Sequence, residues 1–157
     1  MNEIHNILLA EDNPNDVELT LAALDTYHLA NRIVVVSDGA EALDYLYSRG
    51  KHQGRTPGNP ALVLLDLKMP KVDGLEVLRV MKQDASLQPV PVVMLTSSRE
   101  EQDLIHSYRL GVNAYVVKPV EFQAFVEAVR QLGIFWTVHN QPPPGSGASN
   151  PPTTKAP

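Results

Sequence analysis

The sequence contains no cysteine and no long apolar run. With zero Cys among 157 residues, disulfides and thiolate metal sites are excluded. No apolar stretch approaches the roughly 20 residues that a membrane-spanning helix needs, and residues 1–7 lack the basic and apolar regions of a secretory signal. The net charge of -5 is unsuited to a general nucleic-acid binder. We therefore expect a cytoplasmic protein that binds neither membranes nor nucleic acid.

Five short apolar runs alternate with amphipathic stretches, in a chain whose length suits one domain. Each run is rich in Val, Ile, Leu or Ala without regular polar alternation, which is typical of parallel strands covered on both faces. Apolar residues at helical spacing follow the runs. The pattern predicts an α/β fold, a doubly wound five-stranded parallel sheet with five helices. The runs are residues 6–10, 32–36, 61–65, 90–95 and 114–117.

Three of the expected helices carry an N-cap signature. In each, a capping residue is followed three positions later by Glu, which can satisfy backbone N–H groups of the first turn. One such pair is common by chance, but all three agree with the apolar pattern. The pairs are Asp38 with Glu41, Asp73 with Glu76, and Ser98 with Glu101.

Two segments depart from this alternation. Residues 48–60 form a polar connection that is longer than most loops between a helix and a strand. Residues 141–157 hold six of the 13 Pro residues, with Gly, Ser, Asn and Thr. Such a composition buries too little apolar surface to become ordered. We predict a folded domain over residues 1–140 and a disordered tail over 141–157.

Polar side chains follow four of the five runs. Glu11 and Asp12 follow the first, Asp66 the third, Thr96 the fourth and Lys118 the fifth. Ligands of a doubly wound sheet bind at the carboxyl ends of its strands. A single Asp, Thr or Lys in such a place is more often a cap or turn residue, but the joint occurrence of all five favours a functional site.

The residue types at these strand ends suit phosphoryl transfer. Three carboxylates in one cleft repel one another unless one is protonated or a cation such as Mg²⁺ binds them. Lys118 and Thr96 supply an ammonium and a hydroxyl for phosphoryl oxygens, and Asp66 can act as a carboxylate nucleophile. No His or Cys stands at these positions as a hydrolytic base. The site is therefore predicted to accept a phosphoryl group and to hold it.

Four segments together resemble the receiver domains of two-component response regulators. They are residues 8–13 (LLAEDN), 64–74 (LLDLKMPKVDG), 93–97 (VMLTS) and 111–119 (GVNAYVVKP). The resemblance implies a flavodoxin-like fold with strand order 2-1-3-4-5. It also implies that a sensor histidine kinase phosphorylates Asp66. Bound Mg²⁺ or Mn²⁺ would be held by Asp12 and Asp66, with support from Glu11 and from the backbone carbonyl of Lys68.

The resemblance further implies a conformational switch. Lys118 would pair with a phosphoryl oxygen, Thr96 would move to hydrogen-bond the group, and Tyr115 would turn inward behind it. The shift would re-form the face made by the fourth helix, the fifth strand and the fifth helix. The Lys118–Pro119 bond would be cis. A phosphoryl group adds nearly two negative charges and three acceptors, so it would bias a pre-existing equilibrium.

A narrower resemblance is to single-domain, chemotaxis-regulator-like proteins of the phytochrome-associated subgroup. It is carried by residues 48–60, 68–71 (KMPK) and 133–136 (GIFW). It implies a phytochrome as the donor kinase and a homodimer through the face just described. No output module is present in the sequence, so we expect signalling through contact with an unknown downstream protein. Phe135 and Trp136 either fold back on the core or form an interface.

Lys68 bears on two alternatives. Its ammonium is either solvated or reaches the phosphoryl oxygens, which would alter the lifetime of the phosphorylated state.

The rival function is a Mg²⁺-dependent phosphohydrolase with an aspartyl-phosphate intermediate. Enzymes of the haloacid dehalogenase type place a second Asp two residues after the nucleophile, and this chain has Lys68 there. We therefore predict a signalling domain with at most self-phosphorylation and slow self-dephosphorylation.

Overall fold

The fold is seen in a computed structural model that describes residues 6–25, 32–112 and 114–132. Its strands and helices alternate along the chain, as the apolar pattern predicts. In chain order they are β1 (Ile7–Ala10), α1 (Pro14–Leu24), β2 (Ile33–Val36), α2 (Gly39–Leu46), the 3₁₀ helix η3 (Gly50–His52), β3 (Leu62–Asp66), α3 (Gly74–Gln83), β4 (Val92–Thr96), α4 (Arg99–Ser107), β5 (Tyr115–Val117) and α5 (Phe122–Gln131).

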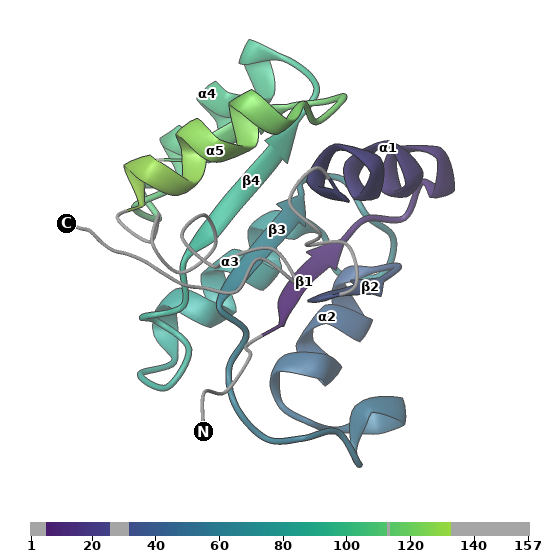
Figure 1. The fold of residues 1–157 in the computed structure, drawn as a ribbon. Coiled ribbons are helices and arrows are strands. Elements are labelled where there is room, and N and C mark those ends of the chain that lie inside the picture. Colours follow the sequence, from purple (N-terminus) through teal and green to yellow (C-terminus); the bar gives the residue numbers. More distant parts are fainter. Residues whose placement is uncertain (1–5, 26–31, 113, 133–157) are drawn as a thin grey trace, which may run out of the picture.

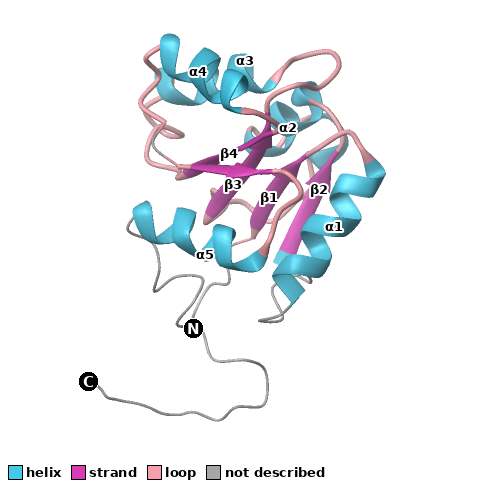
Figure 2. Cartoon of the chain, turned by 90° about the horizontal axis from the view of Figure 1, so that it is seen from above, coloured by secondary structure: helices cyan, strands magenta, loops and turns pink. Residues whose placement is uncertain are grey.

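The five strands form one parallel sheet in the order β2-β1-β3-β4-β5. This confirms the predicted flavodoxin-like topology. Helices α1 and α5 cover one face of the sheet, and α2, α3 and α4 cover the other (Figures 1 and 2). Strands β1, β3 and β4 are buried along their whole length, whereas β2 at the edge is partly exposed. The two apolar cores therefore hold the central strands, and with them the strand ends, in fixed positions.

All three predicted N-caps are present. The side chains of Asp38, Asp73 and Ser98 each accept a hydrogen bond from the backbone N–H three residues later. A fourth cap, Asn13, begins α1 and accepts from Asn15 N at 2.8 Å and from Asp16 N at 3.2 Å. These caps fix where each helix starts relative to the strand before it.

The predicted long connection between α2 and β3 is held by one arginine. It contains η3, and the Arg55 guanidinium donates to the carbonyl oxygens of Tyr45 at 2.6 Å, Thr56 at 2.8 Å and Gly58 at 3.0 Å. The same group lies 4.1 Å from the centre of the Tyr45 ring. The segment is therefore an ordered part of the domain rather than a loose insertion.

Gly74 lets α3 begin close to the end of β3. A Cβ atom added there would lie 2.2 Å from the carbonyl oxygen of Asp66, which is far inside contact distance. Gly74 N donates to the carbonyl of Leu67 at 2.8 Å. The absence of a side chain at this position therefore sets the path of the backbone around Asp66.

Several predictions fall on residues that the structure does not describe. The domain end near residue 140, the tail 141–157, and the placement of Phe135 and Trp136 lie outside the described residues. These remain predictions. Within the described ranges, none of the helices combines the length and apolar character required for crossing a membrane.

Candidate functional site

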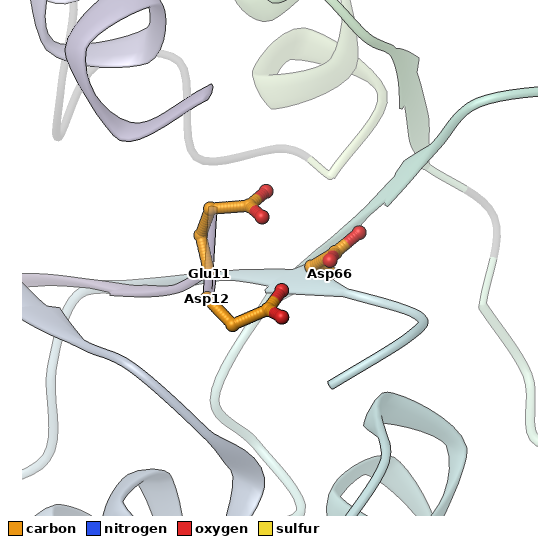
Figure 3. A group of neighbouring side chains, drawn as sticks. All are labelled: Glu11, Asp12 and Asp66. Atoms are coloured by element: carbon orange, nitrogen blue, oxygen red, sulfur yellow. The ribbon is translucent and has the colours of Figure 1, made fainter. Parts of the chain in front are cut away.

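The three predicted carboxylates meet at the carboxyl ends of β1 and β3. Glu11 and Asp12 directly follow β1, and Asp66 is the last residue of β3, its neighbour in the sheet. One carboxylate oxygen from each lies within 4.8 Å of the others (Figure 3). Glu11 is 1% exposed and Asp66 4%, whereas Asp12 is open to solvent. Glu11 and Asp66 therefore form the buried part of the cluster, and Asp12 lies at its solvent-accessible edge.

Lys118 reaches the same cluster from the end of β5. Its Nζ lies 3.0 Å from Asp66 Oδ1 and 3.4 Å from Glu11 Oε1. Its backbone N–H donates to the carbonyl of Thr96 at 2.7 Å, which ties the ends of β4 and β5 together. The Lys118–Pro119 bond is cis, as the family resemblance implies. Residues more than 100 positions apart in the chain thus contact one another directly.

Asp16 is a fourth carboxylate in the site that our sequence analysis missed. It lies in the first turn of α1, and its Oδ2 is 3.3 Å from Lys118 Nζ. The available signal was an acidic residue in the first turn of the helix that starts beside the site. That signal was ambiguous because acidic residues in first turns commonly interact with the helix dipole.

Charge in the site is unbalanced. Burial, and then the charge of Asp66, raises the pKa of Glu11 to about 7. Burial also raises the pKa of Asp66, although Lys118 opposes this shift. For Lys118, burial alone would lower the pKa, but the carboxylates of Asp66, Glu11 and Asp16 outweigh it and raise the value. Lys118 therefore faces three acids, and two of them, Glu11 and Asp66, have a raised pKa.

A hard divalent cation fits this donor set. Mg²⁺ and Mn²⁺ prefer oxygen ligands, and Glu11, Asp12 and Asp66 offer carboxylate oxygens close enough to share one ion. A cation would also offset the burial and the repulsion from Asp66 that together raise the pKa of Glu11. The residues that would hold it are those three.

The two predicted switch residues lie on adjacent strands. Thr96 ends β4, is 0% exposed, and accepts a hydrogen bond from Gln102 Nε2 at 3.3 Å. Tyr115 begins β5, is partly buried, and donates its hydroxyl to the carbonyl of Val112 at 3.2 Å. Burial raises the pKa of the Tyr115 hydroxyl. Gln102 was not singled out from the sequence.

Lys68 turns toward α4 and is largely solvated. Its side chain is 80% exposed, and its Nζ lies 3.7 Å from Glu101 Oε2. Glu101 also accepts from Ser97 N and from Ser97 Oγ, both at 2.9 Å. This arrangement is compatible with both readings of Lys68, because an exposed ammonium can reorient. The role of its backbone carbonyl stays a prediction.

Comparison with known proteins places most of the chain in one family. Residues 7–130 match the response regulator receiver domain. The response regulator Rcp1 of Synechocystis sp. is 38% identical over 130 residues, which cover 83% of this chain and 87% of Rcp1.

Solved structures of phytochrome response regulators have the same fold. The bacteriophytochrome response regulator AtBRR is 61% identical, with a TM-score of 0.84, over 89% of this chain and 100% of AtBRR. The phosphorylated cyanobacterial phytochrome response regulator RcpA is 37% identical, with a TM-score of 0.69, over 91% of this chain and 100% of RcpA. The Mn²⁺-bound form of Rcp1 is 35% identical, with a TM-score of 0.67, over 90% of this chain and 99% of that structure.

Proposed function

Because this chain belongs to the response regulator receiver family, we propose that it accepts a phosphoryl group on Asp66 from a sensor histidine kinase. The observation that carries the proposal is the convergence of Glu11, Asp12 and Lys118 on the buried Asp66 carboxylate. A buried carboxylate can act as a nucleophile. The ammonium paired with it and the cation site beside it are already in place to neutralise the charge of the transferred phosphoryl group.

The proposed reaction forms one bond and breaks one. An oxygen of the Asp66 carboxylate attacks the phosphorus of a phosphohistidine, and the N–P bond breaks with its electron pair passing to the imidazole nitrogen. The product is an acyl phosphate on Asp66. A divalent cation held by Glu11, Asp12 and Asp66 would neutralise charge on the transferred group. Lys118 supplies an ammonium for one phosphoryl oxygen, and the Thr96 hydroxyl can donate to another.

The same geometry disfavours the phosphohydrolase alternative. Lys68, two residues after Asp66, carries no carboxylate, and its ammonium points to Glu101. Glu11 and Asp12, which lie beside Asp66, are the acids that the cation would need. Incubation with p-nitrophenyl phosphate and Mg²⁺ tests the alternative, since sustained turnover that Asp66→Asn abolishes would establish an enzyme.

The proposed output is a change of surface. Movement of Thr96 toward the phosphoryl group, with Tyr115 following, would alter the face made by α4, β5 and α5. Three large apolar residues are exposed on this face: Leu104 on α4, Tyr108 at the C-cap of α4 and Val117 on β5. We propose that this face forms a homodimer and contacts a downstream protein in the cytoplasm. Chromatography that gives a monomer both with and without phosphorylation would contradict the dimer.

The proposed donor is a phytochrome kinase. Support comes from the similarity to AtBRR and RcpA, whose names link them to phytochromes. The test is a screen of sensor kinases with radiolabelled ATP, including a red-light-sensing kinase. We expect transfer to the wild-type chain from the phytochrome kinase and none to Asp66→Asn. Rapid labelling by unrelated kinases, with none from the phytochrome kinase, would contradict the pairing.

A further inference from the structure

A side chain from α4 holds the hydroxyl of Thr96. Gln102, in the first turns of α4, places Nε2 3.3 Å from Thr96 Oγ1. Thr96 is 0% exposed, and Gln102 is partly buried above it. When a buried hydroxyl leaves its hydrogen-bond partner without finding another, the free energy of the protein rises. The position of Thr96 in this structure is therefore stabilised by a specific contact.

The start of α4 is itself fixed to the strand end. Glu101 accepts two hydrogen bonds from Ser97, the residue after Thr96, through its N–H and its Oγ, both at 2.9 Å. Ser98 Oγ accepts from Glu101 N at 3.2 Å and caps the helix. Gln102 follows directly after this anchored residue. Its amide is thus presented to Thr96 from a backbone that is anchored to the end of β4.

We infer that Gln102 is a positioning residue that keeps the Thr96 hydroxyl in its resting place and opposes its movement toward a phosphoryl group on Asp66. This inference rests on the proposed function. The Gln102–Thr96 hydrogen bond is made in the resting position, and movement of the hydroxyl toward Asp66 would break it, so the bond would bias the equilibrium between the two positions. The loss of one such hydrogen bond shifts an equilibrium by about two- to tenfold.

Two substitutions at Gln102 separate this role from a structural one because they act in opposite directions. Gln102→Leu removes the donor at similar size and releases Thr96. Gln102→Glu keeps the shape but presents a carboxylate, which accepts a hydrogen bond from the Thr96 hydroxyl and competes with the phosphoryl oxygens for it. Gln53→Leu, at an exposed position directly after η3 and away from the face made by α4, β5 and α5, is the control.

The experiment measures the level and rate of labelling by acetyl phosphate with Mg²⁺. Labelling of the wild type but not of Asp66→Asn establishes independently that Asp66 accepts a phosphoryl group. We then expect about two- to tenfold more labelling of Gln102→Leu, less than wild type for Gln102→Glu, and no change for Gln53→Leu. Wild-type labelling of both Gln102 variants, or a decrease in both, overturns the inference while the proposed function stands.

A double substitution tests whether Gln102 acts through Thr96. In a Thr96→Ala background there is no hydroxyl to hold, so Gln102→Leu is expected to change labelling no further. An equal effect of Gln102→Leu in both backgrounds would show that Gln102 acts on the site by another route, and would overturn the inference. If the wild type takes label neither from acetyl phosphate nor from any kinase of the screen, the proposed function and this inference fail together.

Discussion

Cation binding by this site is predicted to depend on the protonation of Glu11. With a pKa of about 7, roughly nine in ten Glu11 side chains carry a proton at pH 6.0, and roughly one in ten at pH 8.0. A carboxyl group must lose its proton to act as a ligand. Because the raised pKa leaves the acid neutral at low pH, affinity rises with pH across this window. We predict Mg²⁺ affinity about tenfold weaker at pH 6.0 than at pH 8.0.

Isothermal titration calorimetry at the two pH values measures this directly. Buffers of different ionisation enthalpy also give the proton release, which is predicted to be close to one per Mg²⁺ at pH 6.0 and close to zero at pH 8.0. Glu11→Gln removes the titrating group and is expected to bind Mg²⁺ weakly, with little pH dependence. Equal affinity at the two pH values in the wild type, or a tenfold change that persists in Glu11→Gln, would refute the reasoning.

Three further substitutions test other contacts. Asp16→Asn frees Lys118 from one competing carboxylate, so the steady-state labelling of Asp66 by acetyl phosphate should rise, whereas Glu18→Gln on the exposed side of α1 should leave it unchanged; reduced labelling of Asp16→Asn would contradict this. Gly74→Ala places a Cβ 2.2 Å from the Asp66 carbonyl oxygen and should lower the free energy of unfolding in urea by about 1–3 kcal/mol or more. Gly54→Ala, with nothing within 4 Å of the added Cβ, should change this free energy little. Equal urea midpoints of the two variants would show that the backbone adjusts to the added Cβ at Gly74. Lys68→Asn should change the decay rate of phosphorylated Asp66, whereas Lys82→Asn on α3 should not. Identical decay curves for the wild type and both variants would show that the Lys68 side chain does not affect the phosphorylated state.

The fold and most of the site could be predicted because both depend on short-range patterns. Uninterrupted apolar runs mark buried parallel strands, and the order of such strands brings their ends to one edge of the sheet. Glu11, Asp12, Asp66 and Lys118 stand directly at those ends. Their convergence therefore follows from the topology.

The residues that were missed are on helices. Asp16 and Gln102 reach the site from the starts of α1 and α4, and which side of a helix faces a strand end is decided by tertiary packing. The spacing of apolar residues indicates the buried side of a helix. For a polar residue at the border of that side, the sequence pattern is the same whether the side chain contacts solvent or the site. The three hydrogen bonds by which Arg55 orders the connection before β3 were hidden for a similar reason: their acceptors are backbone carbonyls of any sequence.

Attachment of the phosphoryl group to Asp66 is the central feature of the proposed function. Borohydride reduction of the labelled protein converts an aspartyl phosphate to homoserine, and peptide mass spectrometry then identifies the position. We predict homoserine at position 66 in the wild type, only when both Mg²⁺ and the phosphoryl donor are supplied. Homoserine at position 12 instead, or phosphate retained on another residue while position 66 stays aspartate, would contradict the assignment of Asp66 as the acceptor.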